Sequence, residues 1–152
     1  MARQLTITPA ETVEFSQMAR KLHFFAAMKV GMMERILAGI RVAEYERGEK
    51  VCVQGEAGDI FFLVQQGTLQ VSVRKGALSF ARKVATLGPG ECFGEMALLN
   101  QAPRNATVTC RSACRIFALS ALYFKTVLEQ NPEFARGISE LSAARQLELD
   151  LD

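Results

Sequence analysis

The sequence is poor in the side chains that bind metal ions or catalyse reactions. It has one histidine, no tryptophan, and four cysteines without a CxxC pair. A single histidine excludes a three-histidine metal site and leaves only His23 for a Ser–His–Asp or Cys–His arrangement. His23 lies in the apolar stretch 22–25, which is typical of a helix end packed on a core. We therefore expect no metal site and four reduced, mostly buried thiols, as in a cytosolic protein. The cysteines are Cys52, Cys92, Cys110 and Cys114.

Long apolar runs and a strong charge of one sign are absent as well. No apolar run approaches the roughly 18 residues that a membrane-spanning helix needs, and the N-terminus lacks the pattern of a signal peptide. The 18 basic and 16 acidic residues give a net charge of +2, dispersed along the chain, which does not favour a nucleic-acid surface. The 152 residues, 49% of them hydrophobic, suit one globular domain. We expect a cytoplasmic domain whose segment binds neither membrane nor nucleic acid.

Helical patterns occupy both ends of the chain. The run Thr8–Glu11 combines a capping threonine, a proline at the first helical position and a glutamate that can complete a capping box. Apolar residues at helical spacing predict a second helix over Met28–Ile40. After Ser120, the pattern predicts a helix over Ala121–Gln130, and Asn131–Glu133 begins another helix that continues to the end.

Between residues 41 and 119 the pattern changes to short strands rich in β-branched and aromatic residues, separated by recurring glycines. Strands at this spacing are typical of a β-sandwich or barrel, and no room is left for the helices of a parallel α/β sheet. The predicted strands are Val42–Arg47, Val51–Gln54, Ile60–Gln65, Thr68–Arg74, Phe80–Thr86, Ala106–Cys110 and Arg115–Leu119.

One segment inside the strand region breaks the pattern. After the turn Gly88–Gly90, residues Glu95–Leu99 have the composition of a single helical turn, whose unpaired N–H groups can bind an anion. Arg104 follows in a short loop and can bind a phosphate through two N–H groups. Glu95 would repel a bare phosphate but can accept a hydrogen bond from a hydroxyl, so a sugar phosphate or nucleotide suits both. Alternatively, Glu95 only complements the helix dipole, and Arg104 is a surface residue or its salt-bridge partner.

The runs Phe93–Leu99 (FGEMALL) and Pro103–Val108 (PRNATV) resemble the phosphate-binding cassette of the cyclic-nucleotide-binding domain family. This family includes bacterial catabolite activators, protein kinase A regulatory subunits and cyclic-nucleotide-gated channels. The patterns in Gly48–Asp59 and Phe62–Val71 resemble the first four strands of the family. The resemblance covers roughly Leu22 to the C-terminus.

The resemblance implies an α+β, mainly β fold: an antiparallel β-roll of the double-stranded jelly-roll type, with flanking N- and C-terminal helices. A short phosphate-binding helix lies inside the roll. The chain then forms a single domain over 1–152, with N-terminal helices in 1–40, the β-roll in 41–119 and C-terminal helices in 120–152. The phosphate-binding cassette covers 93–108.

Residue by residue, the resemblance also implies a binding site. Glu95 accepts a hydrogen bond from the ribose 2′-hydroxyl, and Arg104 pairs with the singly charged cyclic phosphate, so no metal is needed. Small residues at 97 and 106 let the backbone approach the phosphate. Backbone groups are expected to complete this site. Those of Gly94 and Met96 lie beside the sugar, and the N–H groups of Ala97 and Ala106 donate to the phosphate.

The base is expected to lie against an apolar wall and under a lid. The wall residues are equally well explained as ordinary core: Val73, Ala85, Leu87 and Phe93. Position 105 is Asn, which can donate to phosphate or base, whereas Ala is frequent in cAMP-responsive members and Thr in cGMP-responsive ones. We favour cAMP over cGMP as the ligand. The lid candidates, at helical spacing in the last helix, are Arg136, Leu141 and Arg145.

The resemblance implies a non-catalytic sensor without a cofactor. Ligand binding closes the phosphate-binding turn and re-packs the C-terminal helices over the base. The partner that responds is an effector domain of the same full-length chain or a separate effector protein. The apolar stripe of the final helix can form a homodimer or pack back on the roll.

Three alternatives remain. A DNA-binding regulator fragment of the catabolite-activator type needs a helix-turn-helix beyond the last helix, and the sequence stops before one fits. A cupin-like enzyme on a similar roll needs several histidine ligands. The third alternative is a ligand-independent interaction domain with a vestigial pocket, and the presence of Glu95 and Arg104 argues against it.

Overall fold

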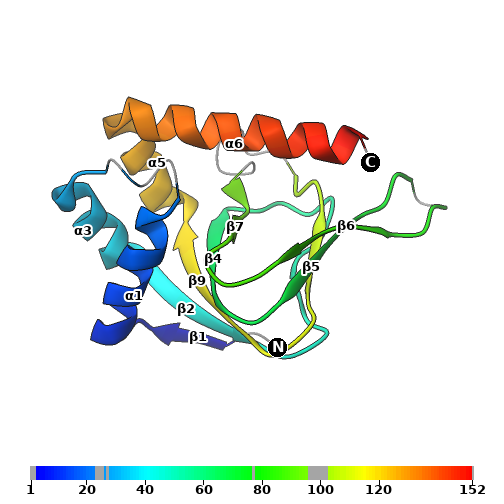
Figure 1. Cartoon of the computed structure of the whole chain (residues 1–152), viewed down its shortest axis with the longest axis horizontal. Helices are drawn as coiled ribbons and strands as arrows, with labels where there is room; N and C mark the ends of the chain where they lie inside the picture. The colour runs from blue at the N-terminus through cyan, green and yellow to red at the C-terminus, as the bar shows by residue number, and fades with distance from the viewer. Residues whose placement is uncertain (1–2, 23–25, 27, 77, 96–102, 152) are drawn as a thin grey trace.

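Two antiparallel sheets form a β-roll in the computed structural model, which describes residues 3–22, 26, 28–76, 78–95 and 103–151 (Figure 1). The five-stranded sheet has the order β1 (Arg3–Thr6), β2 (Ile40–Tyr45), β9 (Cys114–Ser120), β4 (Ile60–Gln66) and β7 (Cys92–Phe93). The four-stranded sheet has the order β3 (Lys50–Cys52), β8 (Thr107–Cys110), β5 (Leu69–Val73) and β6 (Arg82–Leu87). This architecture confirms the predicted fold class.

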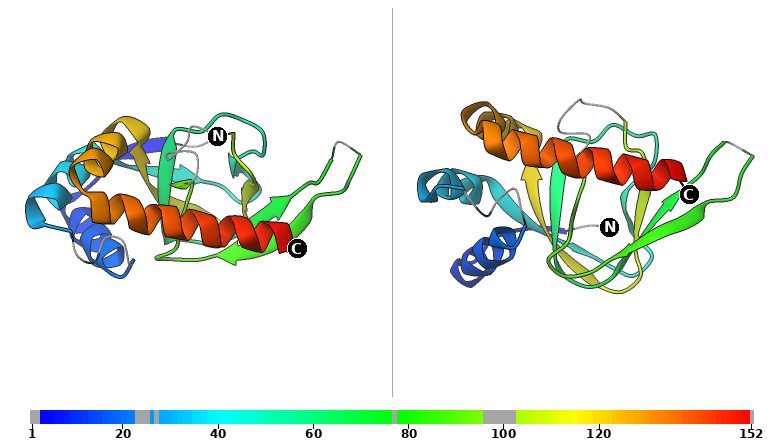
Figure 2. Two further views of the ribbon diagram at one scale, coloured as in Figure 1. Left: turned by 90° about the horizontal axis from the view of Figure 1, so that it is seen from above. Right: turned by 45° about the horizontal axis from the view of Figure 1, so that its top comes forward.

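Helices flank the roll at both ends of the chain. They are α1 (Pro9–Arg20), α3 (Val30–Gly39), α5 (Ala121–Gln130) and α6 (Pro132–Leu151). The α1 and α3 helices lie at one end of the roll, whereas α6 crosses over it toward the connection between β5 and β6 (Figures 1 and 2). The last helix is therefore placed to cover residues that emerge from β7.

The predicted helix starts are present as hydrogen bonds. In α1, the Glu11 N–H donates to the Thr8 hydroxyl and the Thr8 N–H donates to the Glu11 carboxylate, both at 3.2 Å, which completes the capping box. At the start of α6, the Phe134 N–H donates to the Asn131 side-chain oxygen at 3.4 Å. The α3 helix is shorter than predicted, because Ile40 already belongs to β2.

The core consists of two clusters on opposite faces of the five-stranded sheet. Successive residues of β4 alternate between them: Phe61 and Leu63 pack against the helices, whereas Phe62 and Val64 pack inside the roll. Phe15, Ile36, Phe117, Phe134 and Ile138 complete the helix-side cluster, among others. Leu69, Leu87, Phe93, Val108 and Ile116 are members of the cluster inside the roll.

Two strands were not predicted from the sequence. The β1 strand lies in the segment expected to hold only helices and pairs with β2 in the register Arg3↔Glu44. The β7 strand has two residues and pairs with β4. Strands this short carry no periodicity of their own, so they form only because an edge of the sheet is available to them.

A chain of ion pairs joins α1 to the five-stranded sheet. The Arg115 guanidinium of β9 binds the Glu11 carboxylate at 2.9 Å and also pairs with Glu44, which binds Arg3 at 2.8 Å. Burial by itself raises the pKa of Glu11, but the hydrogen bonds from Arg115 and Thr8 bring it below its ordinary value of 4.5. The buried carboxylate is therefore ionised at neutral pH.

Candidate functional site

Pairing between β4 and β7 places the start of the predicted cassette. Phe62 lies opposite Phe93, and their rings stack with centroids 4.8 Å apart. Gly94 follows with a φ of 89°, in the left-handed region. A Cβ atom there would lie 2.7 Å from the Ile60 carbonyl oxygen and 2.9 Å from the guanidinium of Arg104. Only glycine therefore lets the backbone turn here, so close to the arginine.

Arg104 lies directly beside this turn. Its guanidinium donates to the carbonyl oxygens of Gly94 at 3.2 Å and Ile60 at 2.9 Å, and stands 5.8 Å from the Phe62 ring centre. Backbone hydrogen bonds of 2.8 Å to Gly55 and Glu56 hold the loop of Arg104 in place. The two segments that sequence reasoning combined into one site, around residues 94 and 104, are therefore in contact.

Glu95, the predicted ribose acceptor, is buried, with 2% of its surface exposed. Its partner comes from α6: Nη1 of Arg145 donates to both carboxylate oxygens, at 2.9 and 2.8 Å. Nη2 of the same guanidinium donates to the Cys92 carbonyl oxygen at 2.6 Å. Burial by itself lowers the pKa of Arg145, but the Glu95 carboxylate raises it above its ordinary value. The contact is therefore a part-buried salt bridge in which the buried partner is the Glu95 side chain.

The ion pairs of the described residues correct one alternative from the sequence. Glu95 forms its salt bridge with Arg145 and not with Arg104, which binds backbone carbonyls instead. The same helix contacts the other end of the cassette, where the Asn105 side chain donates to the Gln146 side-chain oxygen at 3.3 Å. Two consecutive residues of α6 thus bind the two ends of the cassette.

Of the three lid candidates, the structure brings one to the site. Arg145 contacts Glu95, whereas Arg136 is exposed and Leu141 packs against the helix-side core. Sequence reasoning missed Gln146, although it directly follows Arg145. An amide carries no signal of its own, so only its position next to a candidate residue could have indicated it.

The other predicted site residues differ in what the structure shows of them. Ala106 is buried at the start of β8, and Leu87 and Phe93 belong to the core inside the roll. Val73 and Ala85 are half-buried. Met96, Ala97 and His23 lie outside the described residues. Leu87 and Phe93 are therefore core residues, which was the alternative explanation for them in the sequence analysis. Their role as a ligand wall stays a prediction.

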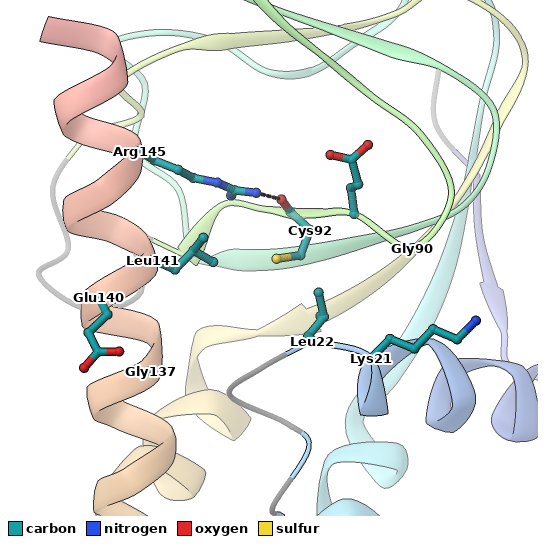
Figure 3. A pocket seen from close by; sticks show the side chains of 9 residues that line it. Lys21, Leu22, Gly90, Cys92, Gly137, Glu140, Leu141 and Arg145 are labelled. Atoms are coloured by element: carbon teal, nitrogen blue, oxygen red, sulfur yellow. Dashed lines mark hydrogen bonds between the residues drawn. The ribbon is translucent and has the colours of Figure 1, made fainter. Parts of the chain in front are cut away.

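A cavity of about 470 Å³, lined in part by Arg145, lies between α6, the end of α1 and the turn before β7 (Figure 3). Its lining includes Leu22, Cys92, Leu141 and Arg145. In Figure 3 the Arg145 side chain reaches from α6 to the Cys92 carbonyl. Burial raises the pKa of the Cys92 thiol to about 12, although Arg145 opposes this, so the thiol stays protonated at neutral pH.

Two kinds of feature are absent from the described residues. No group of three or more His, Cys, Asp and Glu side chains within these ranges could hold a metal ion. No helix within them is long and apolar enough to cross a membrane.

Comparison with known proteins places this geometry in a family. Residues 42–131, which include most of β2, the strands β3 to β9 and the cassette, match the family described as cyclic nucleotide-binding domain. The chain belongs to this family. The resemblance seen in residues 93–108 is thereby confirmed, and the match extends on both sides of the cassette, from β2 to α5.

Curated relatives of this cyclic nucleotide-binding domain include two regulatory subunits of cAMP-dependent protein kinase. The one from Eremothecium gossypii is 38% identical over 82 residues, which cover 54% of this chain and 17% of the relative. The one from Mycosarcoma maydis is 36% identical over 115 residues, which cover 69% of this chain and 22% of the relative. The chain thus spans about a fifth of the length of these relatives.

Solved structures share the fold. The catabolite activator protein of Thermus thermophilus is 28% identical with a TM-score of 0.71, and the match covers 84% of this chain and 60% of that one. The regulatory domain of Toxoplasma gondii protein kinase A, crystallised with cAMP, has a TM-score of 0.77 over 89% of this chain and 49% of that one. At 23% identity, this second likeness shows the fold alone.

Proposed function

We propose that this domain binds a 3′,5′-cyclic nucleotide, cAMP in preference to cGMP, and signals its presence through α6. One observation carries the proposal: the guanidinium of Arg104 binds the carbonyl oxygen of Gly94, the buried Glu95 is the next residue, and α6 holds the Glu95 carboxylate through Arg145. A cyclic nucleotide presents a hydroxyl and a singly charged phosphate on one rigid ring system. It therefore matches a hydroxyl acceptor and a cation held close together.

Arg104 binds the cyclic phosphate in this proposal. A guanidinium has five N–H donors, and the hydrogen bonds of Arg104 within the described residues use two of them. Those two fix the orientation of the planar group, and the remaining donors serve the phosphate. The backbone N–H groups of Ala97 and Ala106 contribute further donors, as the family resemblance implies.

Glu95 links the ligand to α6. Its two oxygens accept from Arg145, and in the complex they also face the ribose 2′-hydroxyl. The contact of Arg145 with Glu95 and the contact of the ligand with Glu95 therefore depend on each other, and this dependence is reciprocal. The effector domain or protein responds to the resulting position of α6. The domain acts as a sensor and does not change its ligand chemically.

Isothermal titration of the purified domain with cAMP and cGMP tests the proposal, with 5′-AMP as the control because its phosphate is not cyclic. We expect cAMP to bind most tightly. 2′-Deoxy-cAMP should bind more weakly than cAMP to the wild type, and Glu95→Gln should reduce this difference while weakening binding less than loss of Arg104 does. Absence of binding to either cyclic nucleotide would refute the function, and equal binding of the 2′-deoxy ligand would refute the role of Glu95.

A further inference from the structure

One hairpin carries basic residues without any acidic ones. Between Asp59 and Glu91 the sequence has four basic residues and no acidic one. The remaining 14 basic and 16 acidic residues sum to −2, so this segment carries +4 on a chain whose net charge is +2. The four basic residues, all exposed, are Arg74, Lys75, Arg82 and Lys83.

The same hairpin exposes two large apolar side chains. Leu78 is 102% exposed and Phe80 is 95% exposed, more than any other large apolar residue described. Every described residue from 74 to 83 is exposed. Apolar side chains that remain fully in water, surrounded by charge, are typical of a surface that binds another molecule.

The geometry of the hairpin separates the apolar tip from the charged base. Its strands end in the pairs Ser72↔Lys83 and Val73↔Arg82, which place basic residues on one strand near the base. Gln54 fixes the other strand, because its side-chain amide donates to the carbonyl and accepts from the N–H of Arg74, both at 2.8 Å. Beyond these contacts the hairpin extends away from the body of the domain (Figures 1 and 2). The Ser79 N–H donates to the Gly76 carbonyl oxygen at 3.0 Å and closes the turn at the end of the hairpin, so Leu78 lies in this turn and Phe80 directly follows it. Arg74 and Arg82 lie nearer the body of the domain, one on each strand.

We propose that this hairpin is a peripheral binding site for an anionic lipid bilayer. Leu78 and Phe80 enter the interface between headgroups and acyl chains, and the four cations contact the negatively charged headgroups. A protruding apolar tip needs no matching pocket in a bilayer, whereas a protein partner must supply one. The position of the cations behind the tip on both strands fits a flat negative surface into which the tip inserts.

This inference is independent of the ligand site. It differs from the expectation of no membrane contact, which rested on the lack of a long apolar run. That lack does not show where charge and apolar surface come together once the hairpin has formed.

Sedimentation with vesicles tests the inference. We expect the full chain to bind vesicles of phosphatidylcholine with 30% phosphatidylserine, and to bind less as salt rises from 0.1 to 0.5 M. Because one Lys or Arg near an anionic surface contributes about a fivefold gain in binding, R82Q/K83Q should weaken binding roughly 25-fold. L78S/F80S should abolish the salt-resistant part of the binding.

The control is V30S/L122S, which removes two apolar side chains that are 68% and 76% exposed elsewhere on the surface. It should bind vesicles as the wild type does, and thermal unfolding should show that every variant is folded. The proposal is overturned if the wild type ignores the anionic vesicles, binds pure phosphatidylcholine equally well, or loses as much binding in V30S/L122S. It is also overturned if L78S/F80S leaves vesicle binding unchanged but reduces self-association in sedimentation velocity, because the hairpin then binds a second copy.

Discussion

At the scale of single residues, Gly94 brings a cation and a carboxylate close together: Arg104 binds its carbonyl oxygen and Glu95 follows it in the chain. We expect Arg104→Ala to weaken cAMP binding about 10- to 150-fold, the equivalent of a charge-assisted contact of about 1.5–3 kcal/mol. Titration calorimetry measures this loss. Arg111→Ala, at an exposed arginine, is the control and should bind cAMP normally. Equal affinity of Arg104→Ala and wild type would contradict the assigned role.

Gly58 allows the position of Arg104 to be tested without changing the arginine. A Cβ atom at Gly58 would lie 1.8 Å from Arg104 Nε, and Gly58 does not have a left-handed backbone. We therefore expect Gly58→Ala to displace the guanidinium and to weaken cAMP binding toward the value for Arg104→Ala, with little change in stability. Gly31→Ala, where a Cβ meets nothing within 4 Å, should leave the affinity unchanged. If Gly58→Ala binds normally, the orientation of Arg104 does not matter for the ligand.

At the scale of elements, the attachment of α1 to the sheet should depend on pH. Because the pKa of Glu11 is lower in the folded protein than its ordinary value of 4.5, this group stabilises the fold above that value, and the contribution disappears as the pH falls through the folded pKa. Glu11→Gln keeps an amide for the capping box but removes the charge. We expect it to cost on the order of 1–3 kcal/mol at pH 7 and progressively less below pH 4.5. Urea unfolding of both proteins between pH 3 and 7 measures the difference, and a constant difference would contradict the prediction.

The coupling of α6 to the cassette rests on Arg145. Arg145→Met leaves the Glu95 carboxylate buried without its cation, which should reduce the free energy of unfolding by on the order of 3 kcal/mol. Hydrogen exchange of α6 should change when cAMP is added to the wild type, and change less in Arg145→Met. Arg136→Met, at an exposed position of the same helix, should behave as the wild type. An equal response of α6 in both variants would show that the signal does not pass through this pair.

At the scale of the whole molecule, all four cysteines belong to the two core clusters, Cys92 on the helix side and the other three inside the roll, and all are free thiols. Burial raises the pKa of Cys52 to about 11 and that of Cys92 to about 12. A thiol reagent at pH 8 should therefore label no cysteine in the folded domain and all four in denaturant. The labelling rate then reports global unfolding. Rapid labelling of one thiol under native conditions would reveal a local opening that the packed roll does not predict.

Much of the fold could be predicted from interactions between residues that are close in sequence. The capping box at Thr8, the proline and asparagine before α6 and the period-two alternation of the strands act between residues close in sequence, so they are visible without a structure. The cassette was visible for a related reason: FGEMALL and PRNATV keep their residue types in order along two short segments. The contact of Arg104 with Gly94 follows from these segments once the roll has formed.

Other features depend on residues far apart in the chain. The path of α6 over the roll decides that Glu95 pairs with Arg145, 50 residues away, and that Asn105 contacts Gln146. The short strands β1 and β7 form because a sheet edge is available, and Leu78 and Phe80 stay in water because their hairpin extends past the body. Local patterns thus determined the family and most of the elements, but not the short strands β1 and β7. Which helix covers that cassette was decided by tertiary packing, since burying a carboxylate requires a cation that only a distant segment provides.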